Sequence, residues 1–334
     1  MVENKRITIS PLELENEILM RTKTNRKRGL DLGWDNANEF MSLKKGYPMF
    51  IAGVGGVGKT EFILDLMLNA SMMHKWNWLI LSPEMGNAEE ILEQIIEKMS
   101  NGKCLEAGHS NSLDAKEIRM IVKWVHKHFR ILDPMREWKH TLKDMALNVE
   151  NFFNMVDREE QLMRGKFDGI LIDPFNELDI DLGGGKTMST VKNELDALLW
   201  WTKQKNYFTV LTNHVNDKAE VRATDHNGQT FFWTPPAKKE EWAYGQQFGR
   251  KGYQMILVHK PADKMIDAEG LQGDKEAEHA MQNYYNMREF YVQKTKPKGV
   301  GKTGKFRLFF DRKLQRYYCL NLEGQKQEIR MPKI

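Results

Sequence analysis

The sequence predicts an α/β domain with a largely parallel central sheet, preceded by a short N-terminal linker helix and closed by a C-terminal β-hairpin. From residue 46 to residue 213, short apolar runs of strand length alternate with amphipathic stretches of helical length, the pattern of parallel strands joined by helical crossovers. A glycine-rich segment, residues 53–60, stands between the first apolar run and the first helical stretch. With 334 residues, 41% of them hydrophobic, the chain is long enough to bury a large core.

The expected elements follow the hydrophobic periodicity in chain order. Five strands are expected at residues 48–53, 78–82, 129–132, 167–173 and 208–213. Helices are expected between them at residues 59–73, 88–99, 115–126, 142–163 and 190–205. Beyond Asn213 the regular pattern stops, and residues 215–245 and 261–285 are expected to form long polar loops. A strand at residues 289–294 then precedes a hairpin of residues 305–311 and 315–320.

The N-terminal segment predicts a short amphipathic helix. Ser10 and Glu13 have the spacing of a capping box around Pro11, and Leu14 and Ile18 follow at helical spacing. A basic run, residues 21–29, looks like a linker, so we expect an N-terminal helix and linker at residues 1–28 and one ATPase domain at residues 29–334. The apolar stripe of this helix has two possible partners, its own domain or a neighbouring subunit.

Composition narrows the class of protein. The chain has no 18-residue apolar run and no apolar signal region after Met1, so a cytoplasmic protein without a membrane partner is expected. Two cysteines, Cys104 and Cys319, are too few for a disulfide scaffold or a four-thiolate zinc site. Residues 286–334 carry 13 Lys and Arg against 4 Asp and Glu, interleaved with aromatic residues. That block is either a nucleic-acid surface or the solvated face of a hairpin whose aromatic residues lie in the core.

Residues 53–60 predict a nucleotide site. The segment has the spacing Gly-x-x-x-x-Gly-Lys-Thr, in which backbone N–H groups of a glycine-rich turn at a helix N-terminus surround phosphate. Lys59 is expected to reach the β- and γ-phosphates of ATP, and Thr60 to hold Mg²⁺. The residues expected to bind the nucleotide are Gly53, Gly55, Gly56, Val57, Gly58, Lys59 and Thr60.

Three polar residues stand where later strands end. Asp173 closes the apolar run of residues 167–173, as a carboxylate that binds Mg²⁺ does in such domains, although an acid there can also cap a turn. Glu84 follows the second strand and is a candidate to polarise the attacking water, or is a solvated acid. His214 follows the fifth strand and is either a γ-phosphate sensor or a structural histidine.

These motifs together resemble the RecA-type core of the DnaB/Twinkle and bacteriophage replicative ring helicases. The resemblance rests on the phosphate loop, Ser82-Pro83-Glu84-Met85, Ile170-Leu171-Ile172-Asp173 and Thr212-Asn213-His214, and covers roughly residues 28–318. It implies a RecA-like P-loop ATPase that assembles as a ring, usually a hexamer, around single-stranded DNA, with each ATP site at a subunit interface. It also implies that Glu84 is the catalytic carboxylate, Asp173 the Mg²⁺ ligand and His214 the γ-phosphate sensor.

The chain departs from that family on a late strand, where the family commonly has Lys-Asn-Arg with the arginine acting on the neighbour's ATP. Here Lys294 and Lys296 occupy the motif, as in RecA recombinases, and lysine lacks the bidentate fork of arginine. A solvated basic turn is the competing interpretation of both lysines.

The resemblance also maps the DNA-contacting loops to residues 179–188 and 215–244. The basic residues expected to contact DNA are Lys186, Lys218 and Arg222, with Arg250 beside Gln246 and Gln247 in a further DNA-proximal motif. Surface loops without a ligand are the alternative.

The sequence therefore predicts a ring-forming, ATP-dependent replicative DNA helicase, of bacteriophage origin and located in the host cytoplasm, that translocates on single-stranded DNA. No fused primase or N-terminal collar is expected, which leaves a separate primase or loader as a partner. Two alternatives stay open: a RecA-like strand-exchange ATPase that forms filaments, and a slow ATP-dependent switch or loader.

Overall fold

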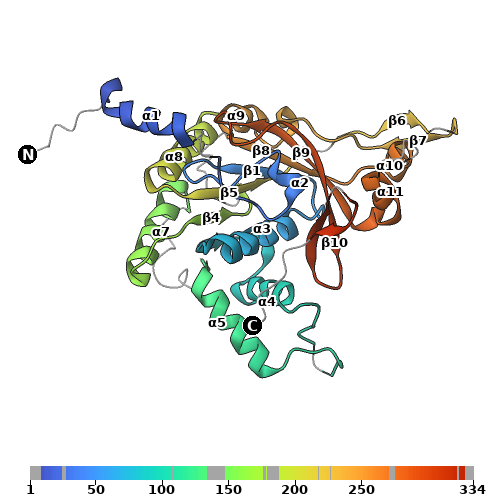
Figure 1. Cartoon of the computed structure of the whole chain (residues 1–334), viewed down its shortest axis with the longest axis horizontal. Helices are drawn as coiled ribbons and strands as arrows, with labels where there is room; N and C mark the ends of the chain where they lie inside the picture. The colour runs from blue at the N-terminus through green and yellow to red at the C-terminus, as the bar shows by residue number, and fades with distance from the viewer. Residues whose placement is uncertain are drawn as a thin grey trace, which may run out of the picture.

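The structure is a computed structural model of the whole chain (Figure 1). It describes residues 9–24, 28–106, 108–133, 147–175, 178, 188–216, 218–225, 227–270, 275–321 and 323–327. None of the helices in these ranges is both long and apolar enough to cross a membrane.

A ten-stranded sheet runs through the domain in the order β12-β11-β10-β9-β8-β1-β5-β4-β2-β3. The strands from β8 to β3 in this order are parallel to one another, and those from β9 to β12 pair antiparallel. The predicted class, an α/β fold with a largely parallel sheet, is confirmed. The strands are β1 Met49–Ala52, β2 Trp78–Leu81, β3 Phe129–Ile131, β4 Gly169–Ile172, β5 Phe208–Asn213, β8 Gln254–His259, β9 Met287–Thr295, β10 Gly304–Asp311, β11 Arg316–Leu320 and β12 Lys326–Gln327.

Helices cover both faces of the sheet and enclose two apolar cores (Figure 1). Along β1 the side chains alternate, so that Met49 and Ile51 belong to one core and Phe50 and Ala52 to the other. The first core contains residues of α3, α4 and α5, and the second those of α7, α8 and α9. The helices are α2 Asp35–Asn38, α3 Lys59–His74, α4 Ala88–Met99, α5 Ala115–His128, α7 Val149–Met163, α8 Met188–Lys205, α9 Gly245–Lys251, α10 Asp263–Gly270 and α11 Lys275–Gln282.

Side-chain caps fix where several of these helices begin. The Asn87 carboxamide accepts the Glu90 N–H at the start of α4, and the Glu90 carboxylate accepts the Asn87 N–H in return. At α5, Asp114 accepts the N–H groups of Lys116 and Glu117. The helix expected from residue 142 begins at Val149, after its cap Asn148, and residues 142–146 lie outside the described residues.

The region after β5 is where the sequence prediction was wrong. Instead of long loops, residues 215–285 include a two-stranded hairpin, β6 Val221–Thr224 and β7 Thr230–Trp233, the helices α9, α10 and α11, and the central strand β8. Strand β8 pairs in parallel with β1 and antiparallel with β9, so it joins the two halves of the sheet. Its apolar run is short, Met255 to Val258, and no long helical stretch directly precedes it.

The N-terminal segment forms a 3-10 turn, η1 Pro11–Leu14, followed by helix α1 Glu15–Thr24. The Ser10 N–H donates to the Glu13 carboxylate at 3.4 Å, as the predicted capping box requires. Helix α1 extends away from the domain body in Figure 1, and Leu12 and Met20 are 78% and 59% exposed. This chain's own domain therefore does not cover the apolar side chains of the segment.

The basic C-terminal block forms β9, β10 and β11, with its aromatic residues in the core. Phe306, Phe309, Tyr317 and Tyr318 are all buried, and Phe310 packs against the first core. Of the two interpretations of this block, the structure favours the solvated hairpin face over an aromatic nucleic-acid surface.

Candidate functional site

The phosphate-loop segment connects β1 to α3 in a conformation that needs its glycines. Gly56 and Gly58 have φ values of 68° and 97°, a region that residues with a Cβ rarely adopt. A Cβ on Gly58 would also lie 2.7 Å from the Tyr317 hydroxyl, and one on Gly53 would lie 2.8 Å from the Val258 carbonyl oxygen. Val54, Gly55 and Gly56 form an exposed crest, with nothing within 4 Å of a Cβ built on either glycine. The crest leaves room for an anion at the N-terminus of α3.

Lys59 opens α3 and is almost fully buried. Its ammonium donates to the carbonyl oxygens of Gly53 at 3.0 Å and Val54 at 3.2 Å. Burial lowers the pKa of Lys59, and the nearby carboxylates of Glu84 and Asp173 oppose that shift. The lysine and both predicted carboxylates therefore share one electrostatic environment.

Asp173 follows the last residue of β4 and is 1% exposed. Its carboxylate accepts two hydroxyl groups, from Ser82 at 3.0 Å and from Thr212 at 2.5 Å. These partners stand at the ends of the flanking strands β2 and β5, so the order β5-β4-β2 fixes the carboxylate beside the phosphate loop. No group of three or more Asp, Glu, His and Cys side chains within the described ranges could hold a metal ion alone. Thr60 and Asp173 suit Mg²⁺, which takes few protein oxygens and completes its shell with phosphate and water.

Glu84 and His214 meet above the same edge of the sheet. Glu84 lies in the 3-10 turn η2 Pro83–Met85 after β2, and His214 follows β5. The His214 Nε2 atom is 3.7 Å from Glu84 Oε2, and both side chains are partly exposed. Because the C-terminal ends of parallel strands gather at one edge, β1, β2, β4 and β5 bring Lys59, Glu84, Asp173 and His214 together.

Lys294 and Lys296 lie at the opposite edge of the sheet. Thr295 pairs with Gln254, which pairs with Met49, the first residue of β1, whereas the phosphate loop follows the last. The Lys294 ammonium donates to the carbonyl oxygens of Gly249 and Arg250 near the end of α9, and Lys296 is exposed. Neither lysine is placed to reach the phosphate loop of its own chain.

Lys294 is expected to make the stability of the fold rise with pH. Burial, and then the positive charges of Lys296 and Lys239, lower the pKa of Lys294 from 10.5 to about 8. Between these values the unfolded chain binds more protons than the folded chain, so the free energy of unfolding increases with pH across that window and the contribution is absent below it. The Tm of Lys294→Met should gain less than the wild-type Tm between pH 8 and pH 10.5. Lys298→Met, at an exposed position, should behave as wild type, and equal gains in all three proteins would contradict the prediction.

The predicted DNA-contacting residues are dispersed. Lys218 pairs with Glu241 at 2.9 Å, Arg222 is exposed on β6, and Arg250 is exposed on α9. Gln246 is also exposed on α9, but Gln247 is buried. Lys186 lies outside the described residues.

Sequence reasoning missed Arg288 and Tyr317, which contact the phosphate loop from the C-terminal strands. The Arg288 Nε group donates to the Val57 carbonyl oxygen at 2.7 Å, and the Tyr317 hydroxyl lies close to Gly58. Both residues stand on strands reached only through β8, so no local pattern placed them beside the loop.

A pocket of about 310 Å³ lies beside the phosphate loop. Val54 lines it together with Asn216 and Lys218 after β5 and with His259 at the end of β8. The His259 Nε2 atom is buried without a hydrogen-bond partner in the described structure, and burial lowers the pKa of this histidine. The pocket separates the phosphate loop from the segment that leads to the β6–β7 hairpin.

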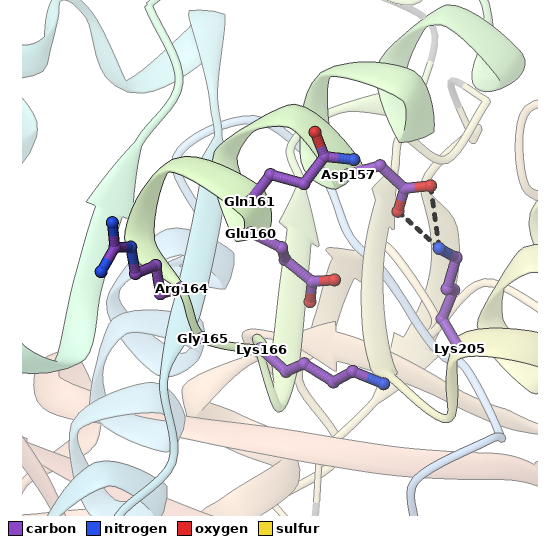
Figure 2. A pocket seen from close by; sticks show the side chains of 7 residues that line it. All are labelled: Asp157, Glu160, Gln161, Arg164, Gly165, Lys166 and Lys205. Atoms are coloured by element: carbon purple, nitrogen blue, oxygen red, sulfur yellow. Dashed lines mark hydrogen bonds and ion pairs between the residues drawn. The ribbon is translucent and has the colours of Figure 1, made fainter.

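A second hollow, of about 420 Å³, lies between the end of α7, the start of β4 and the end of α8 (Figure 2). Figure 2 shows Lys205 directed at Asp157, with N–O distances of 2.7 and 2.8 Å, and Arg164 directed away from this pair. Glu160 accepts the Phe167 N–H at 2.8 Å, which ties α7 to the segment that enters β4. The hollow adjoins the N-terminal ends of the parallel strands and is not part of the phosphate-loop site.

Comparison with known proteins identifies the fold. No known protein-family profile and no curated protein sequence matches this chain. Among solved structures, the ATPase domain of a phage helicase is similar, with a TM-score of 0.65 and 13% identity, over 93% of this chain and 98% of that one. A DnaB-like replicative helicase, whose structure was described with its interactions with primase, is similar with a TM-score of 0.63 and 13% identity, over 94% of this chain and 68% of that one. The chain therefore has the RecA-like α/β fold of DnaB-like helicase ATPase domains.

Proposed function

We propose that this chain is an ATP hydrolase that drives a ring-forming replicative DNA helicase along single-stranded DNA. The observation that carries the proposal is the grouping of Lys59, Glu84, Asp173 and His214 at one edge of the sheet, beside the glycine-rich loop. Each of these residues has a defined task in phosphoryl transfer to water. The fold shared with DnaB-like helicases supports the motor class.

The chemistry assigned to these residues follows from their positions. The loop N–H groups and Lys59 bind the phosphates, and Thr60 and Asp173 hold Mg²⁺, which neutralises charge on the phosphate oxygens when bound. Glu84 orients the attacking water and accepts its proton. His214, 3.7 Å from Glu84, is placed to hydrogen-bond the γ-phosphate and to respond when it leaves.

The test of this function is the ATPase rate of the purified chain with and without single-stranded DNA, followed by unwinding of a forked duplex. We expect DNA to stimulate hydrolysis, unwinding to require ATP, and a chelator of divalent cations to abolish both. Hydrolysis near background that only a partner protein raises would instead favour the switch or loader.

We also propose that the working form is an oligomer in which the ATP site is shared. Lys294 and Lys296 lie far from their own phosphate loop, so they suit the loop of a neighbouring subunit. A hexameric ring is the first choice, and the Lys-x-Lys motif favours a recombinase-like filament as the second. A separate primase or loader remains a proposed partner.

The exposed stripe of the N-terminal segment is expected to hold subunits together. Leu12 and Ile18 are 78% and 51% exposed, and an apolar stripe that its own domain leaves bare suits a second copy of the chain. The double variant Leu12→Ser/Ile18→Ser should shift the population from oligomers towards monomers in light scattering with ATP, without lowering Tm. Met265→Ser, at an exposed position on α10, serves as control, and an unchanged oligomer in the double variant would contradict the expectation.

A further inference from the structure

The β6–β7 hairpin is a separate two-stranded sheet that projects beyond α10 (Figure 1). The Asp225 carboxylate closes its turn by accepting the N–H groups of Asn227 at 3.0 Å and Gln229 at 2.7 Å. On one face of the hairpin, Phe231 lies with its ring centre 5.5 Å from the Lys264 ammonium of α10, and Lys264 also pairs with Asp225 at 3.2 Å. These contacts hold the hairpin in a fixed place, so its other face is presented in a defined orientation.

That other face carries Arg222 and Phe232 directly opposite each other across the two strands. Phe232 is 64% exposed, and the Arg222 guanidinium donates to the Thr230 hydroxyl at 3.3 Å. Side chains opposite each other on one face have Cβ atoms about 5 Å apart, so ring and guanidinium are neighbours. The remaining pair on this face is Thr224 and Thr230, so the aromatic ring has polar surroundings.

We propose that Phe232 stacks on a base of single-stranded DNA while Arg222 binds the adjacent phosphate. A nucleotide offers a flat π-face and an anionic oxygen within one unit, and a ring beside a guanidinium matches both. A stable protein partner needs about 800 Å² on each side, more than four side chains of a narrow hairpin provide. This inference rests on the proposed function, because it names the contact through which the motor holds DNA bases.

The hairpin is also connected to the ATP site. Its two ends are paired next to His214, where the Ala243 N–H donates to the His214 carbonyl oxygen and the Asn216 N–H to the Glu241 carbonyl oxygen, both at 2.9 Å. Val215 and Trp242 form a bridge between these two bonds. A displacement of His214 by the γ-phosphate would therefore move the hairpin and the base that it holds.

The experiment compares binding of fluorescent oligothymidine with binding of an abasic oligonucleotide of the same length. Because stacking contributes about 5- to 150-fold per base, the wild type should bind oligothymidine at least about fivefold more tightly. Phe232→Ala should abolish this preference and leave abasic binding unchanged, and Phe232→Trp should keep it. Arg222→Gln should weaken both ligands equally and lower the slope of log K against log salt by about one.

Trp200→Ala is the matched control, because Trp200 is 55% exposed on α8, away from the hairpin. Its preference for oligothymidine should equal that of the wild type. Three results would overturn the proposal: no preference in the wild type, a preference that survives Phe232→Ala, or a Phe232→Ala variant that loses its oligomeric state but not its preference. DNA-stimulated ATPase in the wild type, measured alongside, separates this failure from that of the proposed function.

Discussion

Replacing Glu84 with Gln is expected to lower kcat for ATP hydrolysis by about 10²- to 10⁴-fold, the range that a positioned general base contributes. The amide keeps the size of the side chain and cannot accept the proton of the attacking water. Nucleotide affinity should stay close to that of the wild type, because Lys59 and the loop N–H groups bind the phosphates and Glu84 does not.

The measurement for this prediction pairs single-turnover hydrolysis with binding of a fluorescent ATP analogue. Glu89→Gln is a suitable control, because Glu89 is an exposed acid in the first turn of α4. Hydrolysis by Glu84→Gln within about twofold of the wild-type rate would remove Glu84 from the chemistry, since a positioned base contributes far more. Weak nucleotide binding by the same variant would instead assign Glu84 to the phosphate site.

Replacing Lys296 with Ala is expected to lower DNA-stimulated hydrolysis by at least about 10²-fold. This is less than the 10³- to 10⁵-fold effect of an arginine finger, because lysine is a point charge without a bidentate fork. Since Lys296 lies at the sheet edge opposite its own phosphate loop, the loss should be one of trans action. Lys298→Ala, at an exposed position nearby, should retain activity.

Mixing two inactive variants distinguishes trans action from a structural role. Lys59→Ala chains keep the trans lysine, and Lys296→Ala chains keep an intact phosphate loop. In a heterologous assembly of equal parts, about one quarter of the interfaces would combine the two intact halves and regain activity. A mixture as inactive as its components would show that Lys296 does not act on a neighbour.

The phosphate loop could be predicted from sequence because its chemistry is local. The spacing from Gly53 to Thr60 fixes both the turn and the helix N-terminus, and the structure has that arrangement. Asp173, Glu84 and His214 could be proposed because each follows an apolar run, and parallel strands deliver their ends to one edge. Their functional roles remain predictions that the kinetic experiments test.

The parts that could not be predicted depend on pairing between distant segments. Strand β8 has only four consecutive apolar residues, Met255 to Val258, and without it the last strands had no place in the sheet. Arg288 beside the phosphate loop and Lys294 at the far edge both follow from the antiparallel pairing of β9 with β8. The β6–β7 hairpin has only a weak local signal, a turn of Asp225 to Gly228 between two alternating runs, which a loop would show equally well.

The central claim is that the ATP site is completed by a second copy of this chain. Electron microscopy of the purified protein, with a non-hydrolysable ATP analogue and single-stranded DNA, tests it most directly. We predict closed rings in which Lys296 of one subunit lies against the γ-phosphate held by the loop of the next. Monomers with a nucleotide enclosed by one chain, or assemblies whose interfaces lie away from the phosphate loop, would contradict the account.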